Sequence, residues 1–144
     1  MNDEMLREAL ARDIDRHRAE EGEILEHYHA LSDQVGNGLL GLLINHIATE
    51  EEMHHFLLGT LSDWLRAPRR PDEAVSDPRA DRDTLLSQTR MLRGHEKKTI
   101  DACRSLQASL SGEEGALLDA FLEAIATDSE KHQRLLATVE ALIP

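Results

Sequence analysis

Glutamate, aspartate and histidine side chains recur in this sequence at spacings that suit metal binding. Glu51 and His54 are three residues apart and Glu50 and His54 are four apart, so on a helix either pair lies on one face. Asp128 and His132 repeat the four-residue spacing nearer the C-terminus. Carboxylate and imidazole groups together suit iron, manganese and zinc. These pairs therefore predict a site for a divalent transition metal.

The elements that would position these pairs are helices. Apolar residues recur at helical spacing in four segments, and aromatic residues make up only 3% of the chain, which favours helices over sheets. Glycine- or proline-containing stretches separate the segments at 36–38, 67–82 and 111–112. We predict an all-α fold, an antiparallel four-helix bundle formed by one domain over residues 1–144. A first helical hairpin covers about 4–66, a long crossover loop about 67–82, and a second hairpin about 83–143.

The two predicted hairpins resemble each other in sequence. The segment that begins at Glu21, EGEILEHYHAL, aligns with the one that begins at Glu96, EKKTIDACRSL. In the second helix of each half, IATEEEMHH from Ile47 aligns with IATDSEKHQ from Ile125. Each hairpin has an apolar stripe that it cannot bury alone, so two of them favour a bundle with pseudo-twofold symmetry.

Several acidic and histidine residues stand on the stripes that would face the core of this bundle. An ionised side chain in a dry interior is strongly disfavoured unless it is paired, so acids gathered at one level require cations. We therefore expect a buried metal site with ligands from all four helices. The candidate ligands are Glu21, Glu50, Glu51, His54, Glu96, Asp128 and His132.

This order of ligands resembles that of the ferritin-like family, which includes bacterioferritin and rubrerythrin. In that family one Glu comes from each of two helices and a Glu-x-x-His motif from each of the other two, and the set binds two iron or manganese ions. By this resemblance, Glu21 and Glu96 are the lone glutamates. Glu51 with His54 is the first paired motif, and His132 is the histidine of the second.

The second paired motif departs from the family pattern. Ser129 stands where its glutamate belongs, and Asp128, one position earlier, is the substitute that the sequence offers. Two iron ions are expected if the substitution is tolerated, and one if it is not. Manganese and zinc are the alternatives to iron.

The resemblance implies a di-iron or di-manganese carboxylate protein that reacts with oxygen or peroxide, in its enzymatic form an oxidoreductase of the ferroxidase or peroxidase type. A hemerythrin-like carrier or sensor of oxygen or iron is a second hypothesis. It rests on His46-x-x-x-Glu50, with His17 and His95 as further ligands, although Ala124 stands where His46 would repeat. A metal-free structural bundle is a third hypothesis, which Ser129 favours.

Composition limits the partners. The net charge of -12 argues against nucleic acid and against an anionic membrane. A single cysteine, Cys103, excludes an internal disulfide and a Cys-x-x-Cys metal module, and fits a cytoplasmic location. The charged first residues do not resemble a signal peptide, and no run reaches the ~20 apolar residues of a membrane helix. A homodimer is expected because twofold assemblies are the commonest homo-oligomers.

Overall fold

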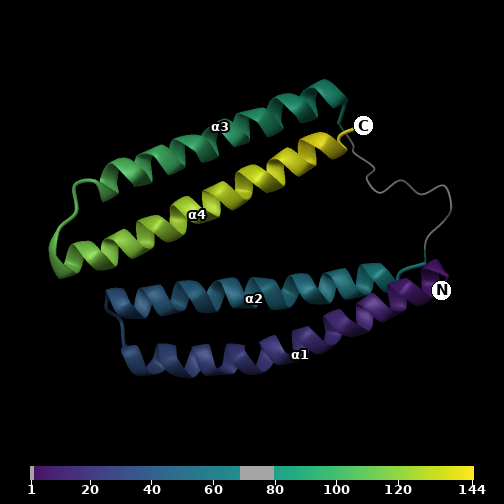
Figure 1. Cartoon of the computed structure of the whole chain (residues 1–144), viewed down its shortest axis with the longest axis horizontal. Helices are drawn as coiled ribbons and strands as arrows, with labels where there is room; N and C mark the ends of the chain where they lie inside the picture. The colour runs from purple at the N-terminus through teal and green to yellow at the C-terminus, as the bar shows by residue number, and fades with distance from the viewer. Residues whose placement is uncertain (1, 69–79) are drawn as a thin grey trace. The chain divides into compact units, whose positions relative to one another are not determined.

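The computed structural model describes residues 2–68 and 80–144. Four α-helices follow one another in the chain: α1 (Asp3–Val35), α2 (Leu39–Arg66), α3 (Arg82–Gln107) and α4 (Gly112–Leu142) (Figure 1). The helices contact in sequential pairs, α1 with α2 and α3 with α4, and each pair is an antiparallel hairpin that belongs to its own compact unit. The predicted all-α fold and its two hairpins are confirmed. Most of the predicted crossover loop, at 69–79, lies outside the described residues.

Side-chain caps mark where two of the helices begin. Asn2 accepts a hydrogen bond from the backbone N–H of Met5 at 2.8 Å, and Asp81 accepts one from that of Thr84 at 2.9 Å. Such caps satisfy N–H groups that have no partner within the helix. Hydrogen bonds from the backbone N–H and the side-chain hydroxyl of Thr84 hold the pKa of the Asp81 carboxyl below its usual value. None of the described helices combines the length and the apolar character that crossing a membrane requires.

Glycine is needed at two positions of the turn in the first hairpin. Gly36, which ends α1, has a φ of 73°, in the left-handed region that other residues rarely adopt. Gly41, in the first turn of α2, lies so close to this turn that a Cβ atom on it would overlap the Gly36 carbonyl oxygen. The interruption that the sequence shows at 36–38 is therefore a tight, sterically defined connection.

We expect Gly41→Ala to lower the free energy of unfolding by about 1–3 kcal/mol, the usual cost of overpacking, because the added methyl group must displace the turn. Denaturant unfolding followed by circular dichroism measures the change. Gly94→Ala is the matched control, since a Cβ atom on Gly94 of α3 meets nothing within 4 Å. That control should gain about 0.5–1 kcal/mol from helix propensity. Equal stability of Gly41→Ala and the wild type would contradict the close approach.

Small side chains form the contact between the two helices of each hairpin. In the first hairpin the buried residues are Ala11, Gly41, Ala48, Gly59 and Ser62. In the second hairpin they are Leu86, Thr89, Cys103, Gly115, Ala126 and Ser129. Small residues let helix axes approach closely, so each hairpin is held by tight contact of the helices and not by large interlocking side chains.

The large apolar side chains mostly lie outside these contacts. Leu86, 7% exposed, is the one large aliphatic residue among the buried hydrophobic residues of the described chain. On α1, Leu6, Leu10 and Ile24 are 47%, 45% and 50% exposed and follow the same helical row as Glu21. Each hairpin thus leaves an apolar face uncovered by its own helices, as the sequence predicts for half of a bundle.

Arginine side chains link α1 to α2 at the end of the first hairpin where α1 begins and α2 ends. Arg66 donates hydrogen bonds to Asp15 at 2.7 Å and to Glu8 at 3.1 Å, and the Ser62 hydroxyl donates to Asp15 at 2.6 Å. The bonds from Ser62 and Arg66 lower the pKa of the Asp15 carboxyl, and those to Glu8 and Asp15 raise the pKa of Arg66. These interactions bridge the two helices.

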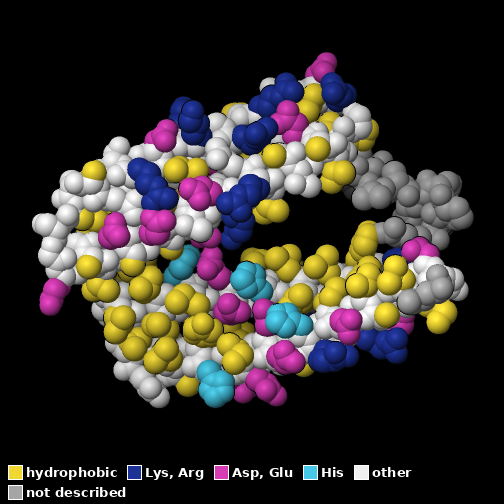
Figure 2. Space-filling view, in the orientation of Figure 1, with side chains coloured by type: hydrophobic (Ala, Val, Ile, Leu, Met, Phe, Trp, Pro, Cys, Tyr) yellow, Lys and Arg dark blue, Asp and Glu magenta, His cyan; other side chains and the backbone are white. Residues whose placement is uncertain are grey.

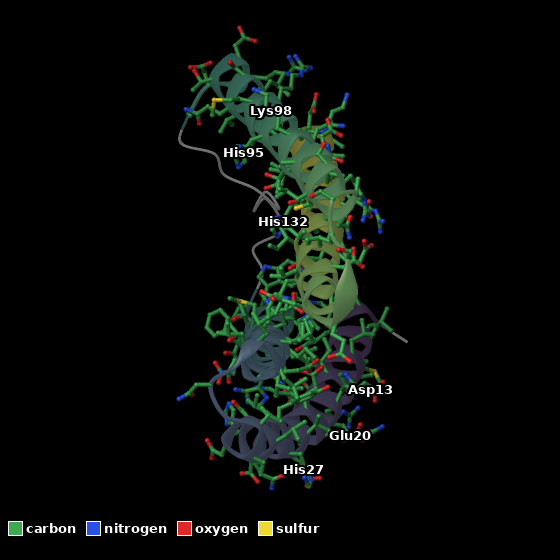
Figure 3. All side chains as sticks on the ribbon, turned by 90° about the vertical axis from the view of Figure 1, so that its left-hand side faces the viewer. Asp13, Glu20, His27, His95, Lys98 and His132 are labelled. Atoms are coloured by element: carbon green, nitrogen blue, oxygen red, sulfur yellow. The ribbon has the colours of Figure 1, made fainter. Side chains whose placement is uncertain are left out.

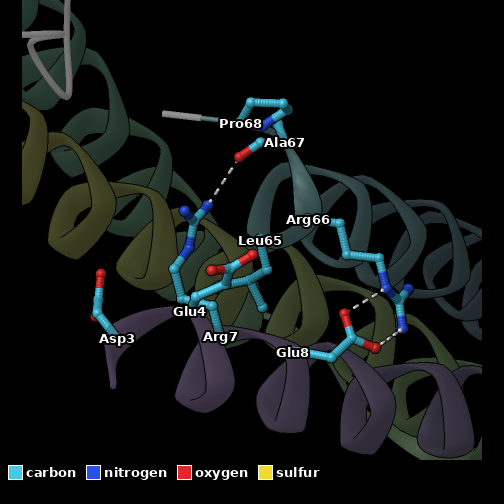
Figure 4. A pocket seen from close by; sticks show the side chains of 8 residues that line it. All are labelled: Asp3, Glu4, Arg7, Glu8, Leu65, Arg66, Ala67 and Pro68. Carbon is cyan, nitrogen blue, oxygen red and sulfur yellow. Dashed lines mark hydrogen bonds and ion pairs between the residues drawn. The ribbon is translucent and has the colours of Figure 1, made fainter. Parts of the chain in front are cut away.

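A cavity of about 670 Å³ opens at the same end of the hairpin (Figure 4). Beside it, Arg7 of α1 donates hydrogen bonds to the carbonyl oxygens of Trp64 at 3.0 Å and Ala67 at 3.4 Å. Carbonyl groups at the C-terminus of a helix have no partner within it and carry partial negative charge, so the cation satisfies them. The arginines at this cavity are therefore used in holding α1 to α2.

Candidate metal centre

Three of the predicted ligands meet on the first hairpin. Glu21 comes from α1, and Glu51 and His54 come from α2. One ligand atom of each residue lies within 4.8 Å of those of the other two. Glu51 Oε2 and His54 Nδ1 are 3.8 Å apart, as expected for residues three apart on a helix. We call this set the Glu21–Glu51–His54 trio.

Glu21 is the most enclosed member of the trio. Its side chain is 17% exposed, compared with 24% for Glu51 and 50% for His54. The Oε2 atom of Glu21 is buried and has no hydrogen-bond partner. A carboxylate oxygen in that position is costly unless a cation or a donor reaches it. The donor set and this orphaned oxygen fit a bound cation, and the half-exposed His54 leaves the trio accessible from solvent.

His17 contacts the other oxygen of Glu21. It lies one helical turn earlier on α1, and its Nε2 atom is 3.5 Å from Glu21 Oε1. The sequence assigned His17 only to the hemerythrin-like hypothesis, yet the four-residue spacing from Glu21 is the signal for this contact. Glu21 therefore has one oxygen facing a histidine and one without a protein partner.

Glu50 makes a different contact from Glu51. Its Oε2 atom lies 3.7 Å from Nε2 of His46, one turn earlier on α2, and Glu50 is not a member of the trio. Glu50 and Glu51 are both candidate ligands beside His54, and Glu51 is the one that lies next to Glu21 in the first hairpin. The His46–Glu50 pair is the one on which the hemerythrin-like hypothesis rests.

The second hairpin repeats part of this arrangement. Glu96 Oε1 of α3 lies 3.4 Å from His132 Nδ1 of α4. Their side chains are 19% and 47% exposed, close to the 17% and 50% of Glu21 and His54. The sequence repeat thus places matching residues in matching environments within each hairpin.

The two hairpins differ in their ligands at the position of Ser129. Ser129 is 4% exposed, in the contact between α3 and α4, and its short side chain offers no carboxylate. Asp128 Oδ1 lies 3.1 Å from the Nζ atom of Lys131, one turn further along α4. Among the described residues of the second hairpin, no third acidic, histidine or cysteine ligand joins Glu96 and His132 within 4.8 Å. The second hairpin has a pair of ligands where the first has a trio.

Other acidic and histidine residues of α1 lie away from this site. Asp13, Glu20 and His27 are exposed and project from the side of α1 that faces away from α2 (Figure 3). The space-filling view shows histidine and acidic side chains next to one another along the first hairpin, between patches of hydrophobic side chains (Figure 2). The first hairpin thus has a surface of mixed character and not a uniformly acidic one.

Comparisons of the chain with protein-family models, with curated proteins and with solved structures found no match. The fold and the site together define an all-α protein of two helical hairpins, the first of which carries a candidate metal centre. The interpretation of that centre depends on the geometry of its residues.

Proposed function

We propose that this protein is a ferritin-like metal-binding protein in which Glu21, Glu51 and His54 hold a divalent transition metal. The observation that carries the proposal is the convergence of their ligand atoms within 4.8 Å, with a buried Glu21 oxygen that no protein donor reaches. Two carboxylates and one imidazole suit iron and manganese, and also zinc. The exposed side of His54 gives an ion and a small reactant a way in.

The residues around the trio support such a role. His17 Nε2 lies 3.5 Å from Glu21 Oε1 and would favour the orientation in which Oε2 of that carboxylate is turned toward the ion. Residues that contact a metal ligand without binding the ion are a regular part of metal sites. They tune the affinity for the ion as well as the orientation of the ligand. Glu21 then offers Oε2 to the ion while its other oxygen remains in contact with His17.

We further propose that the second hairpin provides a weaker site for a second ion. Glu96 of α3 and His132 of α4, whose side-chain atoms lie 3.4 Å apart, are its ligands, with Asp128 as an additional carboxylate. The trio holds the first ion tightly, and the second ion binds less tightly because Ser129 supplies no ligand.

Bound iron or manganese would supply redox chemistry toward oxygen or peroxide. The contribution of the chain is to bind and orient the ions. Glu21 and Glu51 neutralise their charge, and His54 and His132 anchor them from α2 and α4. With Cys103 as its single cysteine, the chain has no Cys-x-x-Cys iron module that could pass electrons to the ions.

Elemental analysis of protein purified from iron-supplemented cells tests this proposal directly. We expect a ratio of one to two transition-metal ions per chain, and oxidation of added Fe(II) by oxygen or peroxide faster than in buffer alone. Absence of any tightly bound metal would overturn the proposal. An intense visible absorption band on exposure to oxygen would instead favour the hemerythrin-like alternative, for which the His46–Glu50 contact at 3.7 Å is the supporting observation.

A further inference from the structure

An open cavity of about 480 Å³ lies between α1 and α2, and no member of the trio lines it. Its lining residues are mostly charged: Asp15, Arg18, Ala19, His55, Asp63 and Arg66. Two of them satisfy each other, since Arg66 donates to Asp15 at 2.7 Å. Arg18 and His55 are the cationic and aromatic groups that remain for a ligand.

Arg18 and His55 each lie against a glycine of the opposite helix. A Cβ atom on Gly59 of α2 would stand 2.9 Å from Cζ of Arg18, so the guanidinium group rests directly on the backbone of α2. A Cβ atom on Gly22 of α1 would stand 3.4 Å from Cε1 of His55. Glycine weakens the interior of a helix, and at these two positions it leaves room for a planar polar group between the helices.

The donors of Arg18 are not used within the first hairpin. Asp15 stands one turn earlier on α1, but its carboxylate accepts hydrogen bonds from Ser62 at 2.6 Å and from Arg66 at 2.7 Å. No carboxylate of the described residues forms a hydrogen bond or an ion pair with Arg18, which is exposed to solvent at the cavity. The cavity therefore contains a guanidinium group that is held in place and open to an anion.

The second hairpin shows what an arginine at this position binds. Arg18 and Arg93 each stand three residues before the glutamate that the sequence repeat aligns. Arg93 donates to Glu140 of the facing helix at 2.7 Å, and Arg90 donates to the other oxygen of that carboxylate at 2.9 Å. Ser62 occupies the position of Glu140 in the first hairpin, because each stands eight residues after the aligned histidine. The facing helix thus offers Arg18 no carboxylate.

We propose that Arg18 and His55 bind the carboxylate group of a small organic acid. The ligand supplies to Arg18 the carboxylate that Glu140 supplies to Arg93. A guanidinium group binds a carboxylate through two parallel hydrogen bonds, which also fixes the orientation of the ligand. The half-buried ring of His55 adds an N–H donor and closes the cavity on the side of Gly22.

Asp63 restricts the charge of the ligand. His55, Gly59 and Asp63 are four residues apart in turn, so they lie along one face of α2 with the Arg18 guanidinium over the middle position. A carboxylate that contacts Arg18 and His55 leaves the rest of the ligand toward Asp63, where a second negative group would be repelled. The ligand is therefore a monocarboxylic acid, and multiply charged phosphate binds less tightly.

Titration of the protein with butyrate, followed by the amide chemical shifts of Gly22 and Gly59 in NMR spectra, tests the proposal. Zinc fills the metal site in these samples, because it is diamagnetic. We expect saturable shifts at both glycines, and a weaker effect of inorganic phosphate at the same ionic strength. Arg18→Gln should bind butyrate about 10–100-fold less tightly, the usual effect of losing hydrogen bonds from a charged group.

Three further variants identify the cause of such a loss. Arg12→Gln is the matched control, since Arg12 is also exposed on α1 and does not line the cavity, and it should bind butyrate like the wild type. Gly59→Ala keeps every charge but displaces the guanidinium group, so it should weaken binding while the protein remains helical. Asp63→Asn removes a repulsive charge and should strengthen binding.

The proposal would be overturned by a wild type without saturable shifts or by an equal loss in Arg12→Gln and Arg18→Gln. Tighter binding of phosphate than of butyrate would also overturn it, in favour of a site for phosphate groups. Arg18→Gln should retain the zinc-to-chain ratio of the wild type, because Arg18 is not a metal ligand. Butyrate binding by a protein that holds no metal would leave this inference standing and contradict only the proposed metal centre.

Discussion

Glu51→Ala should weaken the binding of the first metal ion by at least about 100-fold. Loss of a group that merely supports a ligand costs about 10–100-fold in affinity, and Glu51 is one of three ligands in the trio. The metal-free variant should unfold at the same temperature as the metal-free wild type or higher, because alanine favours the helix and one of two neighbouring carboxylates is gone. Added metal should raise the melting temperature of the wild type and not that of the variant.

Glu52→Ala is the matched control for Glu51→Ala. Glu52 is the next residue of α2, its side chain is 54% exposed, and Oε1 lies 2.8 Å from His29 Nε2 on the other helix of the hairpin. Chelator competition gives the affinities of both variants. If Glu52→Ala weakened metal binding as much as Glu51→Ala, the general acidity of the hairpin and not the trio would be the cause. Unchanged affinity in Glu51→Ala would exclude the trio as the metal site.

The helices and their breaks could be predicted because each depends on local chemistry. The interruption at 36–38 follows from glycine, and Gly36 indeed adopts a left-handed φ of 73°. The Asp81 cap is likewise a local signal, since its carboxylate reaches a backbone N–H three residues on. Such features need no knowledge of the partner helix.

The choice between Glu50 and Glu51 could not be predicted. Both lie on the same helical face as His54, at four and three residues, so spacing along α2 fits either. The position of Glu21 on α1 decides between them, and that position depends on how closely the two helices approach. The approach is set by Gly41, Ala48 and Gly59, small residues that look like gaps in an apolar stripe. The full seven-residue ligand set remains a prediction.

Ser129→Glu should give the second hairpin a metal-binding trio of its own. The new carboxylate would stand beside Glu96 and His132 as Glu51 stands beside Glu21 and His54, and each Glu–His pair already has the same exposure in its hairpin. Isothermal titration should then show an additional tightly bound ion per chain. The metal-free variant should lose about 1–3 kcal/mol of stability, because a charge is placed at a position only 4% exposed.

Ser129→Gln distinguishes the effect of metal binding from the steric cost of a larger side chain at position 129. Glutamine has nearly the size of glutamate and lacks its charge, so it should destabilise the hairpin without gaining an ion. Metal should restore the stability of Ser129→Glu and leave Ser129→Gln unchanged, since only the carboxylate gains a ligand bond on binding. In Glu51→Ala combined with Ser129→Glu, the tight site should move from the first hairpin to the second. Equal responses of Ser129→Glu and Ser129→Gln to metal would show that Glu96 and His132 are an ordinary ion pair and not metal ligands.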